Sequence, residues 1–168
     1  IPGGKKGEFE WVRPRAVESQ ALSRILAEDV MDPAGKGKQV LVDPKGWDWT
    51  RYRGATLITP NRSEFREVVG RWRDAQDMAA KARKLVADLD LGALLVTRSE
   101  EGMSLYTPGT EEHIPAVARE VFDVSGAGDT VIATLGVLIG AGASLPSAMQ
   151  IANQAAGAVR DRACTRGR

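Results

Sequence analysis

The residues most suited to chemistry lie in one glycine-rich stretch, Asp123 to Asp129, which reads DVSGAGD and runs into an apolar segment. Gly126 and Gly128 have no Cβ, so the chain can turn sharply there and an anion can approach the backbone closely. If a helix begins here, its first amides have no acceptor within the helix, and its dipole adds partial positive charge. The spacing therefore predicts a phosphate site made by the amides of residues 126–128.

Asp129 stands in the first turn of that expected helix. A carboxylate at this place can accept the proton of an attacking hydroxyl group, which is the role of an aspartate in phosphoryl transfer. Two other glycine motifs do not fit, because Val131 replaces the third glycine of a dinucleotide fingerprint and no Lys-Ser or Lys-Thr follows Gly128 as in a Walker loop. A plain strand-to-helix turn, with Asp129 as an N-terminal charge, stays open on these residues alone.

Three further segments, in the order DPKG at 43–46, TPNRSE at 59–64 and TRSEEG at 97–102, favour the chemical interpretation. Together with DVSGAGD they resemble the ribokinase-like (PfkB) carbohydrate kinases, over a range from about Val40 to Gly157. The resemblance implies an α/β fold with a mostly parallel central sheet flanked by helices. It also implies an anion hole at Gly126, Ala127 and Gly128, with Asp129 as the catalytic base.

The same resemblance implies ATP and Mg²⁺ as cofactors. Glu64 would hold Mg²⁺ through water, because Mg²⁺ prefers oxygen ligands and keeps several waters. Asp43 and Lys45 would lie on the phosphate side, although an ordinary turn lysine explains Lys45 equally well. The implied nucleotide-binding residues are Asn61, Arg62, Ser63, Glu64, Thr97, Gly102 and Asn153.

Structural explanations compete for several of these residues. Asn61 followed three residues later by Glu64 is a common signal for a helix start. Gly102 can simply turn a hairpin, and Asn153 can be an exposed or locally bonded asparagine within a helix.

Within the family, the residues of the four segments are most similar to those of kinases that act on a heptose 7-phosphate. This similarity implies phosphorylation of the anomeric hydroxyl to a 1,7-bisphosphate, in the synthesis of ADP-heptose for lipopolysaccharide. Kinases of ribose, fructose or a nucleoside stay open, as does an inactive nucleotide-binding fragment. The implied partners are a sugar phosphate and ATP, with a homodimer possible for a full-length protein.

Composition is compatible with such an enzyme. The chain has 168 residues, of which 43% are apolar, which suits one domain with a real core. Lys and Arg total 23 against 22 Asp and Glu, so no global charge attracts nucleic acid or an anionic membrane. The longest apolar run, near residues 131–143, is too short to cross a bilayer. A single cysteine, Cys164, excludes an internal disulfide and suits a cytoplasmic location.

Alternating elements must position the four segments. Periodicity predicts helices at 17–28, 63–69 and 74–89, a buried helix after the glycine-rich stretch, and a last helix from Ser144 to about Val159. Short strands are predicted at 39–42, 55–58, 93–96, 103–106, 113–115 and 120–122. Most of these strands end where one of the four segments begins.

The two ends of the chain depart from the family pattern. We expect an atypical N-terminal segment at 1–35, the C-terminal part of a ribokinase-like domain at 36–159, and a disordered basic tail at 160–168. The family's N-terminal half, with its sugar-binding Gly-Gly segment and β lid, is not recognisable. The sequence therefore predicts a partial kinase domain, from which the sugar cannot be identified.

Overall fold

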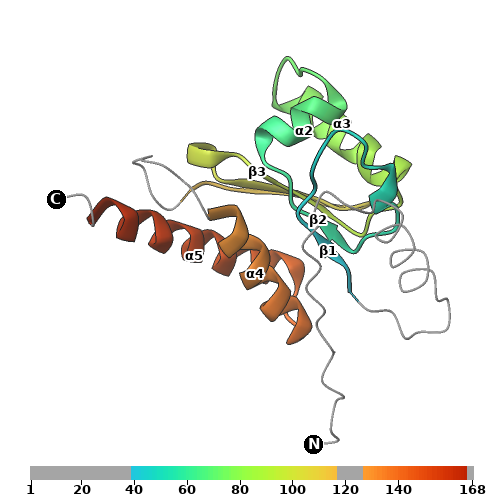
Figure 1. Cartoon of the computed structure of the whole chain (residues 1–168). Coiled ribbons are helices and arrows are strands. Elements are labelled where there is room, and N and C mark those ends of the chain that lie inside the picture. The colour runs from blue at the N-terminus through green and yellow to red at the C-terminus, as the bar shows by residue number, and fades with distance from the viewer. Residues whose placement is uncertain (1–38, 117–126, 166–168) are drawn as a thin grey trace, which may run out of the picture.

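The computed structural model describes residues 39–116 and 127–165, with side chains described except at 127 and 157–165. The chain runs through short strands and helices in alternation (Figure 1). In order these are β1 (Leu41–Val42), η1 (Thr50–Tyr52), β2 (Leu57–Ile58), α2 (Arg62–Val69), α3 (Ala75–Asp88), β3 (Leu94–Thr97), η2 (Ser99–Glu101), β4 (Met103–Tyr106), β5 (Glu111–Ile114), α4 (Ala127–Gly140) and α5 (Leu145–Thr165).

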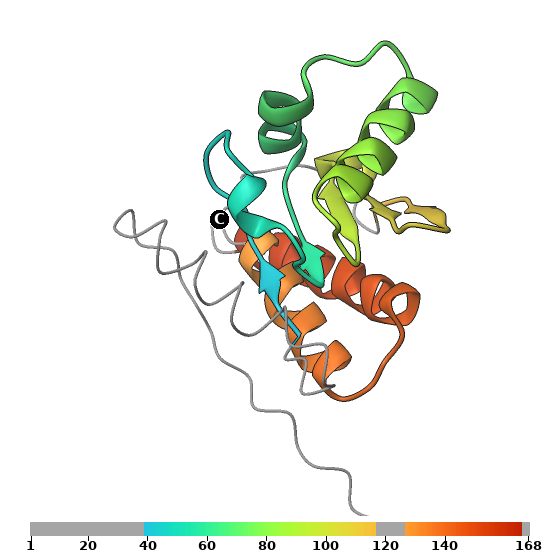
Figure 2. The ribbon, with the colours of Figure 1, turned by 90° about the vertical axis from the view of Figure 1, so that its right-hand side faces the viewer.

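The five described strands form one sheet in the order β1-β2-β3-β4-β5. Strands β1, β2 and β3 run parallel, whereas β4 pairs antiparallel with β3, and β5 with β4. Helices α2 and α3 cover one face of the sheet, and α4 and α5 cover the other (Figures 1 and 2). The predicted α/β class, with a mainly parallel sheet between helices, is confirmed.

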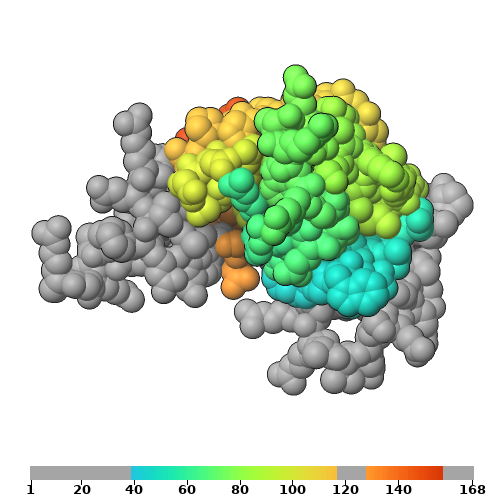
Figure 3. All heavy atoms as spheres, turned by 90° about the horizontal axis from the view of Figure 1, so that it is seen from above, coloured from blue at the N-terminus to red at the C-terminus, as the bar shows by residue number. Residues whose placement is uncertain are grey.

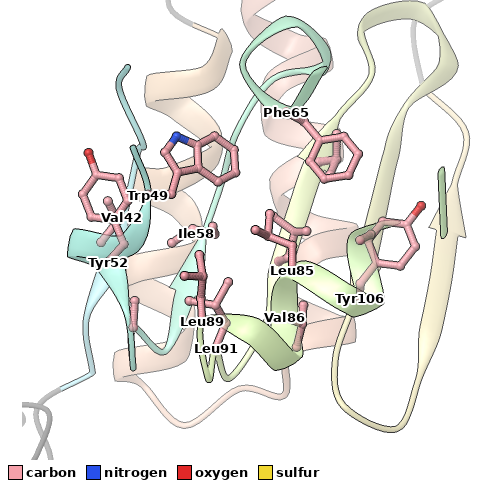
Figure 4. Close-up of a cluster of buried hydrophobic side chains, with 14 of the residues drawn as sticks. Val42, Trp49, Tyr52, Ile58, Phe65, Leu85, Val86, Leu89, Leu91 and Tyr106 are labelled. Carbon is pink, nitrogen blue, oxygen red and sulfur yellow. The ribbon is translucent and has the colours of Figure 1, made fainter. Parts of the chain in front are cut away.

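Both faces of the central strands β3 and β4 are buried, because successive side chains point to opposite sides and helices cover each side. In β3, Leu94 and Val96 pack toward α2 and α3, while Leu95 packs toward α4 and α5. Figure 4 shows the first of these two clusters, in which Phe65 of α2 and Leu85 of α3 lie over the strands. The continuous apolar sequence of this strand is thus explained by burial on both sides.

Strands β1 and β2 are shorter than the predicted ranges 39–42 and 55–58. At their beginning the amide of Val40 donates to the hydroxyl of Thr56 over 3.0 Å, while the carbonyl of Val40 accepts from the amide of Leu57 over 3.1 Å. The short pairing suffices to set the register, with Leu41 opposite Leu57.

The helices follow their local signals closely. Asp74 caps α3 by accepting from the amide of Asp77 over 2.8 Å, and Gly70 ends α2 with a φ of 76°, which favours glycine. The predicted helix at 17–28 and strand at 120–122 lie outside the described residues.

Helix α5 is longer than predicted. It continues past the predicted end near Val159 to Thr165, so it includes residues 160–165 of the basic tail. No glycine or proline interrupts this stretch before Gly167, so nothing in the sequence forces the helix to end at Val159. None of the described helices is both long enough and apolar enough to span a membrane.

Candidate active site

Three of the four predicted segments meet at one edge of the sheet. Because β1, β2 and β3 are parallel, the residues that follow them share the carboxyl edge, where open α/β sheets bind ligands. Asp43 follows β1, Asn61 follows β2, and Thr97 ends β3. The last two are adjacent, since they form an isolated parallel bridge and the amide of Thr97 donates to the carbonyl of Pro60 over 2.9 Å.

The start of α2 is a complete capping box. The side-chain oxygen of Asn61 accepts from the amides of Ser63 and Glu64, at 2.8 and 2.9 Å. In return, Oε2 of Glu64 accepts from the amide of Asn61 over 2.9 Å. The structural explanation for this pair is therefore correct, and the amides of Ser63 and Glu64 already have an internal acceptor.

Glu64 has a second contact beyond its capping role. Its Oε1 accepts from Nζ of Lys45 over 2.7 Å, and the same ammonium lies 3.1 Å from Oδ2 of Asp43. Lys45 thus joins the residues after β1 to the start of α2. Burial alone would lower the pKa of Lys45, but its hydrogen bonds to Glu64 and Asp43 outweigh burial and raise it above the ordinary value. This ammonium therefore stays charged at neutral pH.

Three side chains from residues 49–52 form hydrogen bonds with the turn that carries Lys45. The hydroxyl of buried Tyr52 accepts from the amide of Lys45 over 3.2 Å, and the guanidinium of Arg51 donates to the Lys45 carbonyl. Nε1 of buried Trp49 donates to the carbonyl of Gly46 over 2.9 Å. Since Gly46 has a φ of 75°, a residue without Cβ is favoured at this tight turn.

The pKa of Asp43 indicates that the fourth segment, which contains Asp129, lies near the residues after β1. Burial raises the pKa of Asp43 above its ordinary value; Lys45 opposes this shift, and the negative charges of Glu64 and Asp129 add to it. The carboxylates that follow β1, β2 and the glycine-rich stretch therefore influence one another electrostatically. Helix α4, which carries Asp129, also contacts β1 directly.

The glycine-rich stretch is described only from residue 127 onward, so Gly126 lies outside the described residues. Ala127, Gly128 and Asp129 are the first three residues of α4, and Asp129 is exposed. A Cβ added at Gly128 would meet nothing within 4 Å, so the space beside its backbone is open. Figure 3 shows the beginning of α4, in orange, at the surface beside the green atoms of the α2 region.

Gly102 and Asn153 both contact the end of β5 instead of lining an open surface. Gly102 has a φ of 91°, and an added Cβ would lie 2.0 Å from the carbonyl oxygen of Ile114. The buried Asn153 donates from Nδ2 to the carbonyl of Pro115 over 2.8 Å. Gly102 thus fits its structural explanation, whereas Asn153 is neither exposed nor locally bonded, because its partner lies 38 positions away. The nucleotide-binding roles of both residues stay predictions.

The sequence analysis did not single out two charged residues within TRSEEG. Glu101 pairs with Arg62 of α2 and with Arg98, and Arg98 also donates from Nη1 to Oγ of Ser104 over 3.2 Å. Burial alone would raise the pKa of Glu101, but Arg98 and then Arg62 outweigh it and hold that pKa below its ordinary value. The signal available in the sequence was an arginine followed within three residues by two glutamates, directly after a buried strand.

The carboxylate oxygens at this edge could bind a divalent cation mainly through water molecules. Both oxygens of Glu64 are engaged, one by Asn61 and the other by Lys45. A cation bound through water would leave these bonds intact, which Mg²⁺ tolerates because it retains much of its hydration. Among the described residues, no group of three His, Cys, Asp or Glu side chains is arranged to hold a metal directly.

Comparison with known proteins gives a consistent result. The pfkB family carbohydrate kinase model matches residues 20–167. The bifunctional protein HldE of Shewanella amazonensis is 60% identical over 134 residues, which cover 79% of this chain and 28% of that protein. The D-beta-D-heptose 7-phosphate kinase of Bordetella bronchiseptica is 58% identical over 125 residues, covering 74% of this chain and 40% of the relative. The chain thus spans well under half the length of these curated relatives.

Solved structures agree on the fold. Phosphofructokinase-2 from Escherichia coli in complex with fructose-6-phosphate aligns with a TM-score of 0.72 at 20% identity, covering 89% of this chain and 48% of that one. Ribokinase of Arabidopsis thaliana, complexed with ribose and ATP, aligns with a TM-score of 0.71 at 21% identity, covering 83% and 46%. At these identities the likeness establishes the ribokinase-like fold alone.

Proposed function

The chain belongs to the pfkB family of carbohydrate kinases, and from this premise we propose that it transfers the γ-phosphoryl group of ATP to a sugar phosphate. The preferred acceptor is the anomeric hydroxyl of D-glycero-β-D-manno-heptose 7-phosphate, which would become the 1,7-bisphosphate for ADP-heptose and lipopolysaccharide synthesis. The relatives named above support this acceptor, since one of them is named a heptose 7-phosphate kinase at 58% identity.

The observation that carries the proposal is the grouping of carboxylates and a cation at one edge of the sheet. Asp43, Lys45 and Glu64 are joined by direct contacts, and the charge of Asp129 reaches Asp43. Residues from three separate segments of the chain thus share one electrostatic environment. This grouping is what phosphoryl transfer requires, because the reaction depends mainly on positioning and on charge stabilisation.

In the proposed reaction, Asp129 accepts the proton of the sugar hydroxyl as that oxygen attacks the γ-phosphorus. The bond between the γ-phosphorus and the bridging oxygen breaks, and ADP leaves with the electron pair. Amides of residues 126–128 stabilise the negative charge on the moving phosphoryl group. The open space beside Gly128 fits a close approach of this group to the backbone.

Mg²⁺, when bound, would neutralise charge on the phosphate oxygens of ATP. We assign Glu64 and Asp43 to its hydration shell and Lys45 to the phosphates, because Lys45 carries a positive charge between the two carboxylates. Asn61 supports this arrangement by fixing Glu64 in the capping box. We assign Arg62, Ser63, Thr97, Gly102 and Asn153 to the nucleotide side.

Two measurements test the proposal. Calorimetry with ATP and Mg²⁺ should detect nucleotide binding, and phosphate transfer should favour heptose 7-phosphate over ribose, fructose, fructose 6-phosphate and adenosine. Transfer to one of the other acceptors would keep the family chemistry and reject the heptose. Nucleotide binding without transfer to any acceptor would favour a nucleotide-binding fragment. A homodimer and a cytoplasmic location stay predictions, for which light scattering and cell fractionation are the checks.

A further inference from the structure

Glu101 lies between two arginines from different segments. Its Oε1 pairs with Nη1 of Arg62, the first residue of α2, and its Oε2 pairs with Nη2 of Arg98, the residue after β3. The two carboxylate oxygens therefore bind arginines from different segments of the chain. A single side chain connects the start of α2 to the η2 turn, across a sequence separation of 39 residues.

Arg98 is anchored on its far side. Nη1 of Arg98 donates to Oγ of Ser104, which is buried in β4, and this hydroxyl oxygen lies 3.0 Å from Nδ1 of His113 in β5. The amide of Arg98 also donates to the carbonyl of Gly102 over 2.8 Å. Arg98 thus has little freedom to move, and any group bound to its guanidinium is fixed relative to the sheet.

Arg62 is constrained in a similar way on α2. Its guanidinium lies 5.8 Å from the centroid of the Trp72 ring, within the range of a cation–π contact. Trp72, which follows α2, in turn contacts the buried Phe65 of α2, with ring centroids 5.5 Å apart. The connection made by Glu101 therefore ends on packed groups at both sides.

We propose that Glu101 is a positioning residue that ties the start of α2 to the η2 turn, so that segments 61–64 and 97–102 present one rigid edge to the polyphosphate of a nucleotide. The inference rests on the proposed function. Its physical basis is preorganisation: two loops that are already fixed lose less conformational freedom when a ligand binds between them.

A purely electrostatic role for Glu101 predicts the opposite result. Glu101 neutralises one of two neighbouring guanidinium charges, so its removal would leave more positive charge near the phosphates. ATP would then bind more tightly and with a steeper dependence on salt. The sign of the change in ATP affinity therefore separates positioning from charge.

The test is Glu101→Gln in the complete 168-residue chain, with the Kd for ATP measured by calorimetry in the presence of Mg²⁺. Glutamine keeps the shape of the side chain and removes its charge. We expect ATP to bind about two- to fivefold more weakly, the range that corresponds to the coupling energy of an exposed ion pair. Arg62→Leu should weaken binding at least as much, because it breaks the connection to Glu101 and also removes a residue assigned to the nucleotide side.

A matched control is available on the same molecule. Arg83 of α3 and Glu111 of β5 form a pair of similar exposure, with side chains 53% and 42% exposed against 49% and 37% for Arg62 and Glu101. Glu111→Gln should leave the Kd for ATP unchanged. Equal weakening by Glu111→Gln and Glu101→Gln would overturn the proposal, as would tighter or unchanged binding in Glu101→Gln.

A separate measurement tests the role of Glu101 if the proposed function is wrong. If the unaltered chain binds no ATP, amide hydrogen exchange still tests the connection itself. Glu101→Gln should speed exchange at Ser63 and Glu64 in α2 and at Gly102 after η2, while Glu111→Gln should not. Equal exchange in the two variants at these amides would refute the positioning role even without a ligand.

Discussion

Helices α2 and α4 cover opposite faces of the sheet (Figure 1), and each has a carboxylate as its third residue. The charges of both carboxylates act on Asp43. In α2 the third residue is Glu64, whose side chain is 17% exposed and bends back to cap its own helix and to hold Lys45. In α4 it is Asp129, which is exposed and lies beside the open backbone of Gly128.

A carboxylate at the third position of a helix thus has different surroundings in α2 and in α4. Asn61 supplies an acceptor for the first amides of α2, so those amides serve the fold. At α4, Gly128 supplies no side chain, so its backbone can accommodate an anion. We therefore propose that the α2 start positions Glu64 and Lys45, whereas the α4 start carries the reacting groups. Four substitutions test this division.

The largest effect is expected for Asp129→Asn. Loss of a general base costs about 10²- to 10⁴-fold in turnover, so kcat should fall by that amount in any form of the protein that phosphorylates a sugar. The Kd for ATP should change little, because the amide keeps the size of the carboxylate and only the proton acceptor is lost. Steady-state kinetics and calorimetry give the two numbers. Unchanged kcat would mean that Asp129 is only an N-terminal charge.

A smaller effect, on stability, is expected for Asn61→Ala. The substitution removes the acceptor for two amides at the start of α2, which typically costs about 0.5–2 kcal/mol of unfolding free energy. ATP affinity should fall as well, since Glu64 and Lys45 lose their fixed geometry. Asp74→Ala at the start of α3 is the matched control, because Asp74 caps a helix that holds none of the site residues. Equal ATP affinity in these two variants would contradict the supporting role of the α2 start.

Gly128→Ala should separate stability from activity. The added Cβ meets nothing within 4 Å and alanine favours helices over glycine by up to about 1 kcal/mol, so thermal unfolding should shift upward or stay the same. Turnover should nevertheless fall, because the methyl group occupies the space through which the phosphoryl group approaches the amides. A variant that gained stability and kept full activity would show that no anion uses this backbone.

The smallest effect concerns Asp43, whose pKa is influenced by the carboxylates of both helix starts. Burial raises its pKa in the folded state, so the folded protein binds a proton more readily than the unfolded chain does. The contribution of Asp43 to stability therefore falls as pH rises from the unfolded pKa, near 3.8, through the raised folded value. Asp43→Asn should remove this dependence and stabilise the fold slightly at neutral pH.

Denaturant unfolding of both proteins between about pH 3 and pH 7 measures this difference, with the unfolded reference taken from the ordinary aspartate pKa. The gain in unfolding free energy should be modest, because Asp43 is partly exposed. The substitution also takes one of its two carboxylate partners from Lys45. A variant that loses stability most at neutral pH would show that the ion pair with Lys45 outweighs the cost of burying the carboxylate.

Much of the fold was predictable because its signals are local. The Asn61–Glu64 spacing identified the start of α2, Gly70 its end, and the apolar run ending at Val96 the central strand. The length of α5 was underestimated, because no glycine or proline marks its end before Gly167. The connection from Arg62 to Glu101 could not be predicted, since it joins residues 39 positions apart.

The sequence by itself determined which chemical groups are present and the helices and strands that carry them, because capping, alternation and glycine preferences act over a few residues. Only the tertiary structure decided which groups meet: that Lys45 lies between Asp43 and Glu64, and that Gly102 and Asn153 hold the end of β5. The physical reason is that contacts between distant segments depend on strand order and register, which bring the carboxyl ends of three parallel strands to one edge.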